Sequence, residues 1–323
     1  MIKNFARACA TGLATIPGVT MLTTRFATAP VRFKTAWPYK AIAALASRVT
    51  APRTLIETNF GIATEIRALV PSDKHYLLYG RPDHIEHERG TLDLARIFAR
   101  HSRAFVDVGA NEGLFVFSVA SEIGLSQGAR IHAFEPDIDL YNRLKLNLSR
   151  NMIGAKLNQI AVCDRIGRQT FHRNLNNDLS GSLAKYFTES HETIAVEIDT
   201  TTLSNYLVAN DLTDVCLKID VEGAGSLAWA GTEGARDRIS WLLIEIIGPE
   251  VAENLPRRIL EETGWSAYYI RDYELVPSIA GEFDYRAPFY NWLFCPADRN
   301  RLTKLLTGSK FRVLEPASSK EAR

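Results

Sequence analysis

The feature that most limits how this chain can fold is an alternation of short apolar runs with helical segments between residues 105 and 295. The apolar runs predict strands at residues 105–108, 130–134, 156–162, 215–221, 241–246, 267–270 and 292–295. Segments with a helical repeat lie between them, at residues 113–123, 138–150, 203–209, 225–238 and 256–264. Strands that alternate with helices predict an α/β fold with a mainly parallel sheet and helices on both faces.

A chain of 323 residues is long enough for one α/β core with additions at both ends. Residues 84–100 look helical and lead into that core, whereas the tail after Pro296 is expected to be dispensable to it. The expected divisions are a basic N-terminal extension (1–56), an accessory region (57–99), the catalytic domain (100–296) and a basic C-terminal tail (297–323).

Charge and cysteine content exclude several classes of protein. The formal net charge is only +1, so the chain as a whole gives no reason to expect a nucleic-acid partner. The cysteines are far apart and form no CxxC pair, which argues against both a disulfide framework and a zinc ribbon. A reducing, cytoplasmic location is therefore expected.

The N-terminal extension has a one-sided charge. Every charged residue before Glu57 is Lys or Arg. Its mildly apolar stretch, residues 8–22, is too short and too polar for a membrane span and lacks the apolar core of a signal peptide. We expect an extension that packs on the domain or stays mobile, with weak contact to a membrane surface as the alternative.

The first candidate site follows the first strand, where the chain reads Asp107-Val-Gly-Ala-Asn-Glu-Gly113. Gly109 and Gly113 let the backbone turn sharply and approach a ligand, and Asp107 can hold the turn or meet an ammonium group. The dinucleotide pattern GxGxxG needs a middle glycine that is missing here, and Asn111 would crowd a diphosphate. The motif favours a nucleoside without phosphates, with a plain strand-to-helix turn as the alternative.

Two more charged motifs stand at strand ends. Glu135, before Pro136, can accept hydrogen bonds from both hydroxyls of a ribose; the alternative is a helix cap, a role that Asp137 already fills. Lys218, Asp220 and Glu222 are predicted to share one side of the fourth core strand. Charges on a buried strand are costly unless they are paired or used, so this motif indicates either a site or a stabilising ion pair.

Together these residues resemble the FkbM-type family of methyltransferases over about residues 103–296. The matching stretches are Val106–Gly113, Phe134–Pro136, Ala161–Asp164, Leu179–Leu183, Lys218–Gly223 and Asn291–Phe294. The resemblance implies a class I, Rossmann-like methyltransferase fold, S-adenosylmethionine as the methyl donor and a hydroxyl of a sugar, glycolipid or natural product as the acceptor. The donor contacts that it implies are Asp107, Gly109, Ala110, Asn111, Gly113, Glu135, Pro136, Ala161 and Val162.

The transfer is an in-line displacement that needs alignment and, for an alcohol, a proton acceptor rather than a metal. Asp220 and Glu222 are the best-placed candidates, with Lys218 beside them, and His172 and His191 are weaker ones. Ser180 and Ser182 can line an acceptor pocket, although a flexible loop explains them as well. His84 and His87 have the spacing of metal ligands on a helix, but a solvated helix is the commoner explanation, and we expect no metal.

Two other functions remain open at this stage. A nicotinamide-dependent oxidoreductase uses the same fold class, but the missing glycine argues against it. A binding protein that keeps the fold without catalysis is the other alternative, and the intact Asp107, Glu135 and Asp220 argue against it.

Overall fold

The computed structural model describes residues 54–57, 63–66, 89–174, 181–185, 188, 192–247, 250, 253–278 and 290–315. β1 (Thr54–Glu57) crosses the expected boundary between the extension and the accessory region, and it pairs antiparallel with β2 (Ala63–Ile66). The basic extension before residue 54 lies outside the described residues, and so do the histidine pair His84 and His87, Ser180 and His191.

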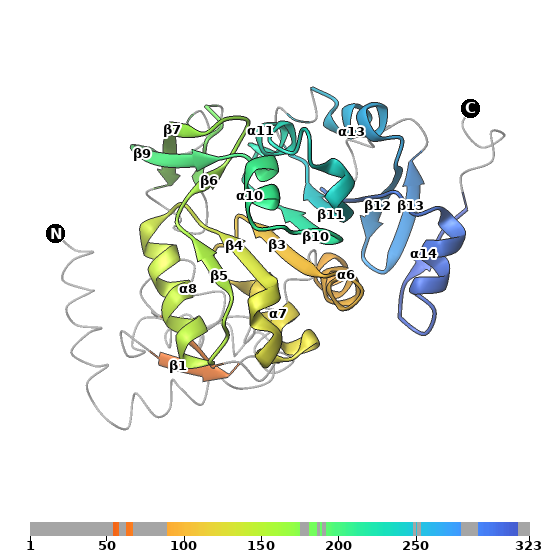
Figure 1. The fold of residues 1–323 in the computed structure, drawn as a ribbon, viewed down its shortest axis with the longest axis horizontal. Helices are drawn as coiled ribbons and strands as arrows, with labels where there is room; N and C mark the ends of the chain where they lie inside the picture. The colour runs from red at the N-terminus through yellow and green to blue at the C-terminus, as the bar shows by residue number, and fades with distance from the viewer. Residues whose placement is uncertain are drawn as a thin grey trace, which may run out of the picture.

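The described residues build a nine-stranded sheet in the order β15-β13-β12-β14-β11-β10-β3-β4-β5 (Figure 1). Neighbouring strands from β11 to β5 are parallel, whereas β14 is antiparallel to both β11 and β12. The expected mainly parallel α/β sheet is therefore confirmed. The strands are β3 (Ala104–Val108), β4 (Ile131–Phe134), β5 (Lys156–Asn158), β10 (Val215–Ile219), β11 (Ile239–Glu245), β12 (Ser266–Arg271), β13 (Glu274–Ser278), β14 (Asn291–Cys295) and β15 (Arg312–Val313).

Helices cover both faces of this sheet, as the apolar strands require. Successive residues of a strand point to opposite faces, so Phe105 and Val106 of β3 enter different cores. The core around Phe105 is closed by α6 (Arg89–Arg100), α7 (Leu114–Ile123), α8 (Ile138–Arg150) and α14 (Arg299–Leu305). The core around Val106 is closed by α10 (Leu203–Ala209), α11 (Gly225–Ala230) and α13 (Leu255–Thr263).

A second sheet, of four described strands, stands beside the main one. It has the order β6-β9-β7-β8, and Figure 1 shows β7 and β9 at the upper left, beyond β6. One expected strand, residues 156–162, is divided between the sheets: β5 joins the main sheet, and β6 pairs with β9. The strands are β6 (Ala161–Val162), β7 (Gly167–Asn174), β8 (Gly181–Ser182) and β9 (Thr193–Thr201).

Element ends agree with the sequence where a polar cap marks them. Asp137 accepts hydrogen bonds from the backbone of Asp139 and Leu140 and caps α8, as predicted. Thr202 caps α10 by accepting a hydrogen bond from the Asn205 amide, and β9 extends through Thr201, directly before this cap. The helix expected over residues 225–238 ends at Ala230 and is followed by a short 3-10 turn at Arg236–Arg238.

The C-terminal tail was expected to be dispensable, and this expectation is wrong. Leu302, Leu306 and Phe311 are buried in the core on the α6 side of the sheet. β15 then pairs with β13 and widens the sheet. The basic composition hid this packing, because the apolar residues of the segment are few and widely spaced.

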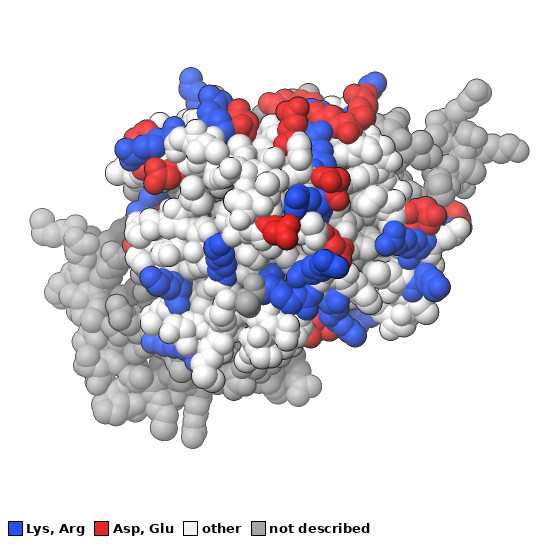
Figure 2. All heavy atoms as spheres, viewed as in Figure 1, with Lys and Arg blue, Asp and Glu red and all other residues white. Residues whose placement is uncertain are grey.

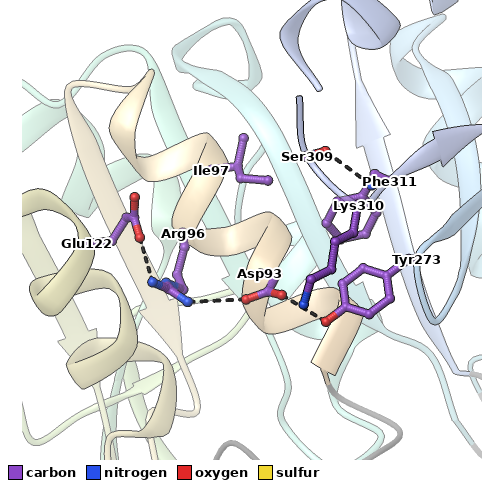
Figure 3. A pocket seen from close by; sticks show the side chains of 8 residues that line it. All are labelled: Asp93, Arg96, Ile97, Glu122, Tyr273, Ser309, Lys310 and Phe311. Atoms are coloured by element: carbon purple, nitrogen blue, oxygen red, sulfur yellow. Dashed lines mark hydrogen bonds and ion pairs between the residues drawn. The ribbon is translucent and has the colours of Figure 1, made fainter. Parts of the chain in front are cut away.

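A pocket of about 160 Å³ lies where this C-terminal segment meets α6 (Figure 3). The Tyr273 hydroxyl donates to Asp93 at 3.0 Å, and Arg96 pairs with Glu122 at 2.6 Å. Burial and the nearby Asp93 carboxylate raise the pKa of Tyr273 to about 12. Residues 309–311 complete the pocket wall. The tail contacts the Tyr273 ring there, with the Phe311 ring centre at 5.2 Å and Lys310 Nζ at 5.0 Å.

Candidate functional site

The candidate site lies where the carboxyl ends of β4, β3 and β10 stand side by side. In the main sheet β4 and β5 lie on one side of β3, whereas β10 and β11 lie on the other. The strand order therefore reverses next to β3. Ligands of open α/β sheets bind at such a reversal, outside the carboxyl ends of the strands.

The turn after β3 has the backbone that the sequence predicted. Gly109, Asn111 and Gly113 all have positive φ, of 82°, 52° and 94°. The amides of Gly109 and Ala110 donate to the Phe134 carbonyl at 3.1 and 2.9 Å, which joins this turn to the end of β4. A side chain at Gly109 would overlap the carbonyl of Asp220, so close strand packing requires glycine there as well.

Glu135 is buried at the end of β4 and joins two loops. Its carboxylate accepts hydrogen bonds from the amides of Asn111 and Asp137, both at 2.8 Å. Burial raises the pKa of Glu135 to about 8, although these two hydrogen bonds act in the opposite direction. Because Asp137 caps α8 by itself, Glu135 is not needed as its cap. A carboxylate oxygen accepts more than one hydrogen bond, so Glu135 can still receive ribose hydroxyls.

A charged cluster joins the ends of β3 and β10. Lys218 pairs in register with Asp107, and its Nζ atom lies 3.5 Å from Asp107 Oδ1 and 3.1 Å from Asp220 Oδ2. The same ammonium group lies 4.4 Å from the centre of the Phe115 ring. The cluster has one cation between two carboxylates, and Asp220 is its most exposed member, with 24% of its side chain accessible.

Asp107 is the buried member of this cluster. Neither of its carboxylate oxygens accepts a hydrogen bond from the described residues. Burial raises its pKa, and the Lys218 ammonium partly opposes that shift. A buried carboxylate without hydrogen bonds is costly, so its surroundings suit a cationic ligand group.

The structure brings most of the predicted residues together, with one exception. β10 ends at Ile219, and Glu222 has a φ of 51° in the turn that follows, so it does not share a strand face with Lys218 and Asp220 as predicted. Ala161 and Val162, predicted to contact the donor, lie in β6 of the second sheet with buried side chains. Pro136 stands between Glu135 and the Asp137 cap, as its motif predicted.

Sequence reasoning missed three residues that shape this edge. Phe115 packs on Lys218, and Arg173 of β7 pairs with Asp139 of α8 at 2.7 Å. Glu250 accepts hydrogen bonds from the amides of Gly225 and Ile247, which holds the chain at the start of α11. Phe115 could have been found, since it lies two residues after Gly113. The other contacts join distant segments without any local signal.

The described residues fit a nucleoside that carries an amino acid, as S-adenosylmethionine does. Glu135 offers acceptors for a ribose, and Asp107 offers a buried anion for an ammonium group. The described part of the chain contains no group of three His, Cys, Asp or Glu side chains that could hold a metal ion. None of the described helices has the length and hydropathy needed to span a bilayer.

Residues 107–254 match the family model of the methyltransferase FkbM domain. This match spans a little under half of the chain, which therefore carries a region similar to the FkbM methyltransferase domain. The mainly parallel α/β sheet of the described residues agrees with the class I methyltransferase fold that the resemblance implied. A search of curated proteins found no match.

Solved structures of methyltransferases are similar at low identity. The FkbM methyltransferase of Methylobacillus flagellatus is 17% identical with a TM-score of 0.39, and the match covers 60% of this chain and 43% of that one. M. capricolum TrmK, solved with S-adenosyl-homocysteine, is 12% identical with a TM-score of 0.33, covering 63% and 66%. A SAM-dependent methyltransferase of Agrobacterium tumefaciens is 7% identical with a TM-score of 0.39, covering 76% and 71%.

Proposed function

We propose that this FkbM domain binds S-adenosylmethionine and transfers its methyl group to a hydroxyl of a sugar, glycolipid or natural product. The observation that supports S-adenosylmethionine as the donor is the pair of buried carboxylates, Asp107 and Glu135, at the ends of neighbouring strands. The first suits an ammonium group and the second a ribose. The hydroxyl acceptor rests on the resemblance to the family.

The reaction needs little from the protein beyond alignment, charge and removal of one proton. Bound S-adenosylmethionine supplies a methyl group on a positively charged sulfur. The acceptor oxygen attacks this methyl group and displaces the sulfur from it. We assign to Asp220 the orientation of the acceptor hydroxyl and the removal of its proton, because it is the most exposed carboxylate of the cluster. Lys218 holds Asp220 and Asp107 in position and reduces their repulsion. Glu222 is the second candidate for the proton.

Methyl transfer from tritiated-methyl S-adenosylmethionine to an extract of the source cells tests this proposal. Asp220→Asn keeps the shape and removes the charge, so we expect turnover to fall by about 10²–10⁴-fold. Affinity for S-adenosylhomocysteine should change less than about tenfold, since the interaction is made in the transition state. Asp211→Asn is the control, because Asp211 is 98% exposed. If Glu222→Gln loses turnover and Asp220→Asn does not, the proton acceptor is Glu222.

We also propose a cytoplasmic enzyme with no nucleic-acid partner. Figure 2 shows Lys and Arg side chains gathered near the middle of one face. Several basic groups of the fold are used within it: Arg130 donates to the carbonyls of Ala99 and Arg103, and Arg238 donates to that of Leu212. These hydrogen bonds occupy guanidinium donors that contact with a phosphate backbone would otherwise use.

The basic extension supports weak contact with an anionic membrane. Each Lys or Arg near such a surface contributes about 1 kcal/mol, and salt screens the attraction. Sedimentation with phosphatidylglycerol vesicles should therefore be stronger for the whole chain than for a chain without residues 1–50. Equal sedimentation of the two forms would exclude this contact.

A further inference from the structure

The hairpin formed by β7 and β8 is anchored at two places on the edge of the candidate site. Arg173 of β7 pairs with Asp137 and Asp139, directly after the end of β4. Ser182 of β8 is buried and donates to the Val221 carbonyl at 3.2 Å, directly after the end of β10. Since β3 lies between β4 and β10, these anchors stand on either side of the glycine turn.

His172 lies beside the second anchor. It pairs directly with Ser182 across the two strands, so both side chains project from the same face of the hairpin. Cβ atoms of such pairs are about 4.5–5.5 Å apart. Ser182 bonds the backbone of Val221, the residue after Asp220, so the strand pair that contains His172 lies beside the end of β10. Among the described residues, the imidazole has no hydrogen-bond or ion-pair partner, although it is half-buried.

We propose that this face of the hairpin is the acceptor-side wall of the site, and that His172 hydrogen-bonds a hydroxyl-rich, sugar-like acceptor. The inference rests on the proposed methyl transfer and adds a residue that determines specificity for the acceptor. Imidazole both donates and accepts, as a hydroxyl does, so a polyhydroxylated ligand satisfies it. Thr170, the next residue on this face, also has a polar neighbour, Glu197. An apolar acceptor would leave His172 without a hydrogen bond.

The test is methyl transfer from tritiated-methyl S-adenosylmethionine to glycan, glycolipid and apolar-metabolite fractions of the cell extract, each at several dilutions. His172→Phe keeps an aromatic strand residue and removes the hydrogen bond. We expect the apparent KM for the glycan or glycolipid fraction to rise about threefold to tenfold, the loss of one hydrogen bond. Affinity for S-adenosylhomocysteine by calorimetry should stay unchanged. His172→Asn, which can still hydrogen-bond, should recover part of the loss.

His101→Gln is the matched control, because His101 is exposed at the end of α6. An unchanged KM in His172→Phe, or methyl transfer confined to the apolar fraction, would overturn the inference while leaving methyl transfer intact. Equal losses of acceptor and donor affinity would also overturn it, because a structural role would explain them. If the wild-type protein labels no fraction while it binds S-adenosylhomocysteine, the proposed acceptor class fails before His172 is tested.

Discussion

At the residue scale, the site depends on carboxylates that the fold removes from water. Glu135 and Asp107 are both buried, and burial raises the pKa of each. The Lys218 ammonium offsets only part of this cost for Asp107. A buried carboxylate with a raised pKa stabilises the folded protein less when it is ionised. A ligand that pairs with the ionised carboxylate restores that stability.

Glu135 makes the stability of the ligand-free protein depend on pH. Its pKa is raised to about 8 in the folded state, so the folded state binds more protons than the unfolded state below that pH. This contribution is fully present below the unfolded pKa and is lost as pH rises through about 8. Between roughly pH 6.5 and 8 we expect the free energy of unfolding to fall by about 1–2 kcal/mol.

Urea unfolding at the two pH values measures this fall, and Glu135→Gln should remove most of it. Burial lowers the pKa of His132 to about 4 in the folded state. Since an unfolded histidine titrates near 6.5, His132 adds a small slope of the opposite sign at the lower edge of this range, and that slope remains in the variant. Glu250, whose pKa burial raises to about 7, adds a slope of the same sign that remains in the variant. Glu261→Gln, at an exposed side chain, should keep the wild-type slope. An unchanged slope in Glu135→Gln would show that Glu135 is ionised in the folded protein.

The charged motifs were predictable at this scale, and their contacts were only partly so. Asp107, Glu135 and Lys218 stand at strand ends in the sequence, where charged residues beside buried strands indicate a site. The contact of Arg173 with Asp137 was not predictable, because it joins segments that no local pattern connects. The position of His172 beside the site was likewise not predictable, because it follows from the pairing of His172 with Ser182 across two strands.

At the element scale, the turn between β3 and α7 is where backbone and packing requirements coincide. Gly109→Ala adds a Cβ atom that overlaps the Asp220 carbonyl, at a φ of 82°. Gly308 has nearly the same φ, 83°, but a Cβ atom added there would have no neighbouring atom within 4 Å. Gly308→Ala should therefore cost only the backbone strain of about 1 kcal/mol, whereas Gly109→Ala should cost several times more.

Thermal melts of both variants, followed by calorimetry with S-adenosylhomocysteine, compare the two costs. We expect Gly109→Ala to lose donor binding as well as stability, since the turn and the end of β10 must move apart. Similar losses in the two variants would show that the clash relaxes freely.

Element existence followed from the hydrophobic pattern, but element ends did not. Strand β3 and helix α8 were predicted nearly to the residue, because each has an apolar pattern bounded by glycine or a capping aspartate. The division of residues 156–162 between two sheets was missed, since period alone does not say which strand pairs with which. The early end of β10 was missed because Glu222 adopts a left-handed turn that glycine more often marks.

At the scale of the whole molecule, the domain extends beyond its family match at both ends. Helix α6 precedes the match, α14 and β15 follow it, and all three add to one core or sheet. Leu302→Ala should cost about 2–5 kcal/mol, because its side chain is fully buried there. Leu125→Ala, at an exposed leucine, is the control for urea unfolding. A cost below about 1 kcal/mol for Leu302→Ala would restore the view that the tail is dispensable.

The central claim is that the ends of β3, β4 and β10 form a donor site for S-adenosylmethionine, and calorimetry with S-adenosylhomocysteine tests it most directly. The wild-type protein should bind S-adenosylhomocysteine and not NAD. Glu135→Ala should weaken that binding roughly ten- to hundredfold, since a carboxylate that receives ribose hydroxyls contributes about 1.5–3 kcal/mol. Equal affinity in a folded Glu135→Ala variant, or binding of NAD in place of S-adenosylhomocysteine, would contradict the account.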